Sequence, residues 1–355
     1  MHYRMPAEWE THTATWLAWP HFRDDWPGKF EPIPWVYAEI IRNLSRYERV
    51  DLIVKDAASA RAALRMLKTA HAWNKNVVLH RWPTDRVWTR DSGCTFVAGS
   101  VSGVSGKRGV KPALCAIKWR FNAWAKYKNY KLDDQIGLLM ADAAQSDWIL
   151  AAYKAREIVL EGGSIDVDGA GTLITTEECL LSRIQQRNPG FAKKDYERVF
   201  AEFLGIDQVL WLGRGIEGDD THGHVDDLTR FVSPNTIVTV LEPNRRDRNY
   251  EPLRENLRRL KAAINLRGKK FEVAELPMPR PVFFEGRRLP ASYANFYIAN
   301  KQVLVPIFND PNDRLALNIL NTLFPGREIV PIYAGDLVWG FGTLHCMTQQ
   351  QPAIG

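Results

Sequence analysis

The sequence has few cysteines, and it has no hydrophobic run of the length that a membrane-spanning helix needs. Its four cysteines are scattered over 355 residues without a C-x-x-C pair, which excludes a disulfide-rich scaffold and favours reduced thiols. No stretch approaches the roughly 20 apolar residues that span a bilayer. The first residues also lack the apolar core of a signal peptide. We therefore expect a soluble, cytoplasmic protein with no membrane partner.

Signatures of nucleotide binding are missing as well. The Gly/Ser-rich segment 99–111 lacks the spacing of a Walker A loop, and the segment 161–171 does not contain G-x-G-x-x-G between a strand and a helix. We interpret 99–111 as a surface loop between strands. The sequence gives no support for NAD or ATP, and we predict no cofactor.

The net charge of +6 and an isoelectric point near 9.1 raise the question of nucleic-acid binding. Basic residues concentrate at 244–249 and 254–270, where leucine and isoleucine recur at near-helical spacing. This pattern predicts the solvated face of an amphipathic helix. No zinc-finger, helix-turn-helix or RNP pattern accompanies it. We expect no nucleic-acid partner, and a non-enzymatic basic binding protein is the more distant alternative.

Helical and strand patterns alternate along the chain. The helical patterns cover 34–48, 57–69, 136–150, 192–204, 251–265 and 312–323. The strand-like runs lie at 51–54, 76–79, 94–97, 156–160, 208–211 and 327–330. Three strand–turn–strand units, each followed by a helix, recur at 164–176, 228–240 and 295–306. The recurrence predicts an α/β fold with an internal ββαβ repeat.

Ionisable residues gather in short segments at 88–93, 161–163, 218–227 and 340–346. If residues 222–226 were extended, His222, His224 and Asp226 would point to one face. Such a group could bind zinc in a metal-dependent hydrolase. A metal-free alternative uses His224 as general acid and base with Asp226 as its neighbour.

The last of these segments contains His345 directly before Cys346. Neighbours in a strand face opposite sides, so His345 is badly placed to activate this thiol, and His224 or His222 would be a better base. Spacing alone does not decide whether Cys94 or Cys346 is the reactive cysteine.

Several longer motifs point together to one family. They are MPAEWETHTATWLAWP (5–20), WTRDSGCTF (88–96), FNAW (121–124), EGGSIDVDGAGTLITTEECLL (161–181), GHVDD (223–227), ASYANFYIAN (291–300) and LHCMTQQQP (344–352). With these motifs the chain resembles the agmatine deiminase and bacterial-type peptidylarginine deiminase family, within the guanidine-modifying (pentein) superfamily. The resemblance implies an α/β fold in which about five ββαβ modules form a five-bladed, pseudo-symmetric propeller. It also implies a single catalytic domain over residues 1–355.

Matched position by position, the resemblance implies an active site without a metal. Cys346 matches the nucleophile of the family, and His224 matches its catalytic histidine. Asp91 and Asp226 match acids that bind the guanidinium, and Glu161 matches the acid that supports the histidine. The implied chemistry is attack by the Cys346 thiolate on the guanidine carbon, followed by hydrolysis of a covalent thiouronium intermediate.

The resemblance leaves two substrates open. Agmatine, giving N-carbamoylputrescine and ammonia for putrescine synthesis, is favoured by the whole set of motifs. A peptidyl or C-terminal arginine, giving citrulline, is the alternative, because segment 125–134 carries three lysines that would repel an ammonium unless they point outward. We expect Asp85, Trp88 and Trp119 to contact the tail of the substrate. The chain is also compatible with a homo-oligomer.

Overall fold

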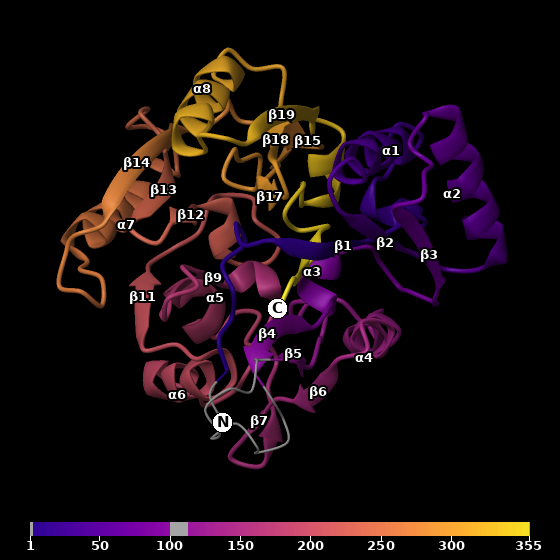
Figure 1. Cartoon of the computed structure of the whole chain (residues 1–355). Helices are drawn as coiled ribbons and strands as arrows, with labels where there is room; N and C mark the ends of the chain where they lie inside the picture. The colour runs from indigo at the N-terminus through magenta and orange to yellow at the C-terminus, as the bar shows by residue number, and fades with distance from the viewer. Residues whose placement is uncertain (1–2, 100–112, 355) are drawn as a thin grey trace.

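The strands form several small mixed sheets and not one continuous sheet. The structure is a computed structural model that describes residues 3–99 and 113–354. Within these ranges, five sheets have three or four strands, in the orders β20-β1-β2-β3, β4-β5-β6, β9-β10-β11, β12-β13-β14 and β17-β18-β19. Figure 1 shows these sheets around the middle of the molecule, with the long helices toward the outside. Residues 100–111 of the predicted surface loop lie outside the described ranges.

Four of these sheets share one pairing pattern. Their strands are β4 (Thr95–Gly99), β5 (Ala113–Lys118), β6 (Asp147–Leu150); β9 (Asp166–Val167), β10 (Thr172–Thr176), β11 (Gln208–Leu212); β12 (Thr229–Ser233), β13 (Thr236–Leu241), β14 (Glu272–Pro277); and β17 (Tyr297–Ala299), β18 (Gln302–Ile307), β19 (Glu328–Tyr333). In each, the first two strands are antiparallel and the third pairs in parallel with the second. A parallel return needs a crossover, which a helix supplies here. The three predicted strand–turn–strand units are confirmed as β9–β10, β12–β13 and β17–β18.

The remaining sheet joins the two ends of the chain. β1 (His12–Ala18) pairs in parallel with β2 (Arg49–Val54), which pairs in parallel with β3 (Val77–Arg81). On its other edge, β1 pairs antiparallel with β20 (Gln349–Pro352). Because β20 follows Cys346 closely in sequence, this pairing brings that cysteine beside the N-terminal part of the chain.

Amphipathic helices cover the sheets. The longer ones are α1 (Ile33–Leu44), α2 (Ala57–Thr69), α4 (Asp133–Ala143), α6 (Lys193–Leu204), α7 (Tyr250–Ala262) and α8 (Asp313–Leu323), and α3 (Thr89–Ser92) and α5 (Glu177–Leu181) are short. All six predicted helices are therefore present. α7 buries Leu253 and Leu260 while Arg254 and Arg258 stay exposed. This confirms that the basic stretch is the solvated face of an amphipathic helix.

The prediction of a helix over 136–150 is wrong at the C-terminal end of that range. α4 stops at Ala143, and Gln145 has a φ of 53°, a left-handed conformation that ends the helix. Residues 147–150 form β6 instead, because they pair with β5. The strands β1, β5 and β14 are also not predicted from the sequence. β1 is buried at nearly every position and so lacks the alternation that marks a strand.

Apolar side chains fill the space between sheets and helices. The largest cluster includes Trp16, Trp26, Trp88 and Met347, and Cys346 is part of it. Two short hairpins lie outside the five sheets: β7 (Ala152–Tyr153) with β8 (Arg156–Glu157), and β15 (Phe283–Phe284) with β16 (Arg287–Arg288). No helix in the described ranges is both long and apolar enough to cross a membrane.

Candidate active site

A cavity of about 260 Å³ reaches the thiol of Cys346. Aromatic side chains form much of its wall, namely Phe22, Trp88, Trp124, Tyr127 and Phe341. Its charged lining residues are Asp24, Asp25, Arg86, Asp91 and Asp220. Because carboxylates outnumber the one arginine among these residues, the cavity is suited to a cation.

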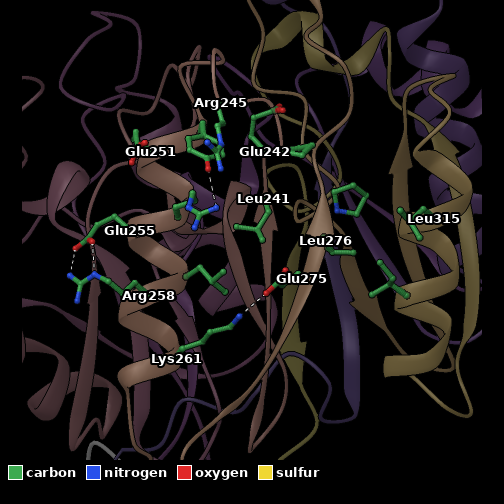
Figure 2. Close-up of a pocket in the computed structure, with 16 residues that line it drawn as sticks. Leu241, Glu242, Arg245, Glu251, Glu255, Arg258, Lys261, Glu275, Leu276 and Leu315 are labelled. Atoms are coloured by element: carbon green, nitrogen blue, oxygen red, sulfur yellow. Dashed lines mark hydrogen bonds and ion pairs between the residues drawn. The ribbon is translucent and has the colours of Figure 1, made fainter.

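A larger groove of about 1040 Å³ lies elsewhere, between α7, the strands β13 and β14, and α8. Figure 2 shows that charged side chains such as Glu255, Arg258 and Lys261 project along α7 and pair with one another or with Glu275. The groove's lining residues include no cysteine or histidine. We therefore place the candidate active site in the smaller cavity.

Cys346 lies in the turn between η4 (Leu337–Gly340) and β20. Its Sγ accepts a hydrogen bond from Nδ2 of Asn295 at 3.1 Å and lies 3.6 Å from Oδ2 of Asp226. Burial, together with nearby carboxylates, raises the pKa of this thiol well above its usual range. The thiol is therefore protonated in the free protein, and a cation in the cavity would favour the thiolate.

Two buried carboxylates flank the thiol. Asp91, in α3, accepts hydrogen bonds from the backbone N of Gly163 at 3.0 Å and from Nε1 of Trp124 at 2.9 Å. Asp226, in η3 (Val225–Asp227), accepts a hydrogen bond from Nδ1 of His345 at 2.7 Å through Oδ2. Its Oδ1 is buried without a partner. Asp226 therefore keeps one oxygen free for a ligand.

The two carboxylates differ in their pKa values. Burial, with help from Asp226 and Glu161, raises the pKa of Asp91 to about 6 although His224 opposes the shift. Burial would also raise the pKa of Asp226, but the hydrogen bond and the charge of His345 hold it below its usual value. Asp226 is consequently ionised at neutral pH, whereas Asp91 loses its charge in mildly acidic solution.

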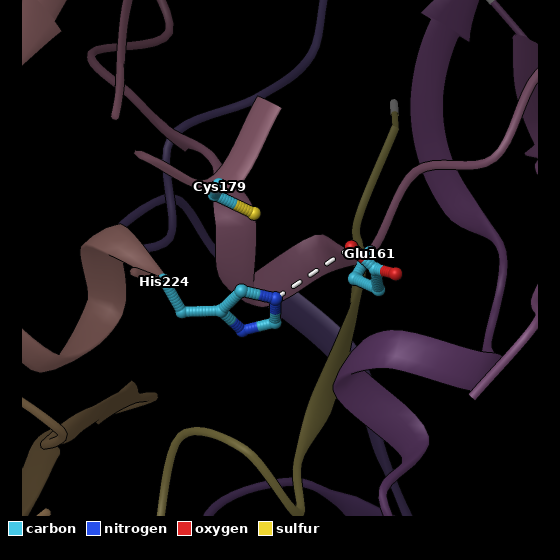
Figure 3. A group of neighbouring side chains, drawn as sticks. All are labelled: Glu161, Cys179 and His224. Carbon is cyan, nitrogen blue, oxygen red and sulfur yellow. Dashed lines mark ion pairs between the residues drawn. The ribbon is translucent and has the colours of Figure 1, made fainter. Parts of the chain in front are cut away.

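His224 and Glu161 form a buried pair behind these groups. Nε2 of His224 lies 3.6 Å from Oε2 of Glu161, and Nδ1 lies 3.9 Å from Oδ2 of Asp91. Neither ring nitrogen has a hydrogen-bond partner. Figure 3 shows the imidazole turned toward Glu161, and the thiol of Cys179 lies within 4.8 Å of both groups. Burial lowers the pKa of His224, but Asp91, Cys179 and Glu161 outweigh it and raise this pKa well above its usual value, so the ring is an imidazolium.

Glu161 is in turn held by Arg187. The guanidinium Nε of Arg187 lies 3.0 and 3.2 Å from the two carboxylate oxygens of Glu161. Both side chains are fully buried. Although burial alone would raise the pKa of Glu161, the charges of Arg187 and His224 lower it. Glu161 is therefore a fixed negative charge beside the histidine.

Gly163, in η2 (Gly162–Ser164), allows these groups to approach one another. A Cβ at this position would lie 2.5 Å from Nδ1 of His224 and 3.0 Å from carboxylate oxygens of both Asp226 and Asp91. Any side chain would therefore push the three groups apart. The same distances show that the histidine and both aspartates surround a single point.

The structure brings together most of the predicted site residues. Cys346, Asp91 and Trp88 line the cavity, and His224, Asp226 and Glu161 pack directly behind it. Two predicted contacts with the substrate tail do not line the cavity. Asp85 accepts a hydrogen bond from the backbone N of Leu132, and Trp119 donates one to Thr95 within an apolar cluster.

The predicted zinc triad of His222, His224 and Asp226 is not assembled. Residues 225–227 form a 3₁₀ turn, and His222 has a left-handed φ of 66°, so the alternation of an extended strand does not apply. Nε2 of His222 pairs with the hydroxyl of Ser182 at 3.0 Å and so lies away from the cavity. The residues that come together are instead Glu161, Cys179 and His224, and separately Asp226, Asp227 and Cys346.

The lysines of segment 125–134 do not place unpaired charges in the cavity. Nζ of Lys126 is paired with Asp220, which also accepts a hydrogen bond from the hydroxyl of Tyr127 at 2.6 Å. Lys128 and Lys131 are exposed. The predicted repulsion of a substrate ammonium is therefore weakened by Asp220.

Several residues of the site are not predicted from the sequence. They are Gly163, Arg187, Asn295, and the cavity residues Asp25, Arg86, Tyr127 and Asp220. Arg187 and Asn295 act through contacts with residues distant in sequence, which no local pattern reveals, although Asn295 lies within the motif at 291–300. Trp124 does belong to the FNAW motif, so a motif signal for it exists.

These groups define a site for nucleophilic chemistry on a planar cation. A thiol, a charged histidine and carboxylates around one point can hold a guanidinium, attack it and move protons. A sequence model of the Porphyromonas-type peptidyl-arginine deiminase family matches residues 4–352, and the chain belongs to this family. This confirms the predicted family.

Relatives and solved structures agree with this assignment. The agmatine deiminase of Pseudomonas aeruginosa is 33% identical, and the match covers 99% of this chain and 96% of that protein. The agmatine deiminase of Enterococcus faecalis has a similar structure, with a TM-score of 0.86, 30% identity, and coverage of 99% of this chain and 96% of that one. A substrate-bound agmatine deiminase of C. jejuni, which carries a cysteine-to-serine substitution, has a TM-score of 0.83 and 29% identity, covering 98% of this chain and 96% of that one.

Proposed function

We propose that this protein is an agmatine deiminase, a hydrolase that converts agmatine and water to N-carbamoylputrescine and ammonia. The observation that carries the proposal is the convergence of Cys346, Asp91, Asp226 and His224 around Gly163 at the end of an aromatic cavity. The names and the full-length similarity of the relatives support the same activity.

Asp91 and Asp226 are proposed to bind the guanidinium. The free Oδ1 of Asp226 and the carboxylate of Asp91 can accept N–H groups from a planar cation between them. This contact fixes the plane of the guanidinium with its central carbon toward Sγ of Cys346.

Cys346 is the proposed nucleophile and His224 the proposed general acid and base. When the cation binds, Cys346 releases its proton to solvent water in the cavity, and its thiolate forms an S–C bond with the guanidine carbon. The His224 imidazolium then gives its proton to one nitrogen, and the C–N bond breaks to release ammonia. The neutral imidazole takes a proton from water, the resulting hydroxide attacks the thiouronium carbon, and the C–S bond breaks as the hydroxyl oxygen becomes the carbonyl of the product. The proton of that hydroxyl group returns Cys346 to the thiol of the free protein. Glu161, held by Arg187, keeps His224 oriented and charged.

A peptidyl or C-terminal arginine is the second candidate substrate. The observation that favours it is Arg86, which lines the cavity and has a buried Nε without a hydrogen-bond partner. A carboxylate or peptide carbonyl could accept from this nitrogen. The description of the matching family also names peptidyl-arginine deiminases.

The test is ammonia release from agmatine, from a peptide with C-terminal arginine, and from free arginine. Turnover of agmatine that is lost in Cys346→Ala and is insensitive to a chelator is the expected result. Preference for the peptide would make the second candidate correct. Activity that survives Cys346→Ala but is lost with the chelator would contradict the deiminase mechanism.

We further propose that the five sheets are five blades of one propeller-like catalytic domain around this site. The pairing pattern shared by four of them, and the completion of the remaining sheet by β20, support the proposal. A cytoplasmic location and a homo-oligomeric state stay predictions.

A further inference from the structure

His345 lies between two buried carboxylates on the side of Asp226 away from its free oxygen. Nδ1 of His345 is 2.7 Å from Oδ2 of Asp226, and Nε2 is 2.8 Å from Oε2 of Glu8. All three side chains are at most 4% exposed. The residue therefore does not activate the thiol next to it in sequence. It connects the catalytic aspartate to the N-terminal segment.

Both ring nitrogens of His345 face a carboxylate oxygen. An ionised carboxylate only accepts hydrogen bonds, and a neutral imidazole has only one N–H group to donate. Although burial opposes it, the charges of Arg230, His345 and Arg90 hold the pKa of Glu8 well below its usual range, so Glu8 is ionised like Asp226.

Glu8 is a rigid anchor for this ring. Its Oε1 accepts hydrogen bonds from Arg230 Nη2 at 2.9 Å and from the backbone N of Ile298 at 2.8 Å. Its Oε2 accepts from Arg90 Nη2 at 3.1 Å in addition to His345. Four donors thus fix one carboxylate, and the imidazole transmits that fixed position to Asp226.

We propose that His345 is a positioning residue that bridges Glu8 and Asp226 and fixes Asp226 for binding the guanidinium of the substrate. The inference rests on the proposed function, because it assigns Asp226 to that guanidinium. With Oδ2 held by His345, only Oδ1 of Asp226 is left for the substrate, and the aspartate keeps its charge despite complete burial.

The test compares His345→Gln with His12→Gln. His12 is a matched control because it is also a buried histidine near Glu8, bound through Nε2 to the backbone O of Glu8 at 2.7 Å, but it has no contact with Asp226. Glutamine cannot donate to both carboxylates, so Asp226 loses its partner and burial raises its pKa. We expect the KM for agmatine to rise about tenfold and the ionisation of Asp226 to join that of Asp91 in the acidic limb of kcat/KM, in His345→Gln only.

The result that overturns the inference is a pH profile and KM of His345→Gln equal to those of His12→Gln. If His345→Gln does not fold, nitrogen-15 NMR of the wild-type imidazole decides the question. An N–H proton on Nδ1 of His345, hydrogen-bonded to Asp226, is expected, and an unprotonated Nδ1 contradicts the proposal. These outcomes are distinct from failure of the proposed function, in which the wild-type protein turns over no guanidine substrate while the NMR result still stands.

Discussion

The guanidinium of Arg187 pairs with both carboxylate oxygens of Glu161, directly behind the imidazole of His224. The three side chains form a buried alternation of positive, negative and positive charge. Neither end member touches solvent, so each charge depends on its neighbour. Arg187 therefore helps to keep His224 protonated, although it acts only through Glu161, which lies between them.

Replacing Arg187 by glutamine should inactivate the protein through His224. Glu161 would be left buried without its cation, and burial would then raise its pKa and neutralise it. We expect kcat for agmatine to fall at least 100-fold and the free energy of unfolding in urea to fall by about 3 kcal/mol. Arg183→Gln, at an exposed position nearby, is the control and should change neither quantity. Wild-type kcat in Arg187→Gln would contradict the proposed role of the pair.

The ionisation of Asp91 should set an acidic limit to activity. Burial raises the pKa of Asp91 to about 6, so the carboxylate is charged above this pH and neutral below it. Only the charged form binds a guanidinium, so kcat/KM should fall as the pH drops through about 6. Butylguanidine is the substrate to use, because it lacks a second charged group. A profile that stays level to pH 5 would contradict the assignment.

The thiol of Cys346 should react slowly with iodoacetamide in the free protein. Burial and three nearby aspartates raise its pKa well above 9, so the thiolate is scarce at neutral pH. We expect the labelling rate, followed by mass spectrometry of the Cys346 peptide, to increase steadily with pH and to reach no plateau below pH 9. The Cys346→Ala variant, labelled in parallel, shows how much of the reaction occurs at the other cysteines. Fast labelling that is independent of pH between 6 and 8 would show a thiolate already present without substrate.

Asp25 should distinguish agmatine from substrates that lack an ammonium. Its side chain lines the cavity, pairs with Arg86 through Oδ1, and has a buried Oδ2 without a partner. Burial raises the pKa of Asp25 to about 7 although Arg86 opposes the shift, and an ammonium would satisfy this carboxylate. We expect Asp25→Asn to raise the KM for agmatine about tenfold but to leave that for butylguanidine nearly unchanged.

Asp25→Asn should also raise the kcat/KM for free arginine relative to that for agmatine, because Arg86 would then be free to bind the carboxylate of arginine. Asp24→Asn is the control, since Asp24 also lines the cavity but is exposed. An equal change in KM for agmatine and butylguanidine would show that Asp25 does not contact the substrate tail.

Much of the fold follows from local patterns in the sequence. The hairpin β12–β13 is predictable because Ser233, Pro234 and Asn235 separate two β-branched runs with turn residues. The helix α7 is predictable because its leucines recur at helical spacing. β6 is missed because its identity depends on pairing with β5, a contact that periodicity does not contain.

The candidate site divides in the same way. Cys346, His224, Asp91, Asp226 and Glu161 lie within motifs that can be recognised from the sequence. Of their supporting residues, Gly163 and Asn295 also lie within motifs, which do not reveal their contacts, whereas Arg187 lies outside them. Arg187 is recognised only through Glu161, and Asn295 only through Cys346, after the chain has folded. For His345, the sequence indicates what it does not do, but its partner Glu8 is 337 positions away.

Because β20 pairs with β1, we expect the active site to assemble at the end of folding. The strand pairs from β4 to β19 form within their own ββαβ units, whereas β20 reaches β1 through a loop that spans nearly the whole chain. Closing so long a loop is slow, and contacts of this range form late. Cys346 and His345 lie shortly before β20 and take up their positions when that strand docks. During refolding, helical and strand signals should therefore recover first, and the return of catalytic activity should follow the slowest phase.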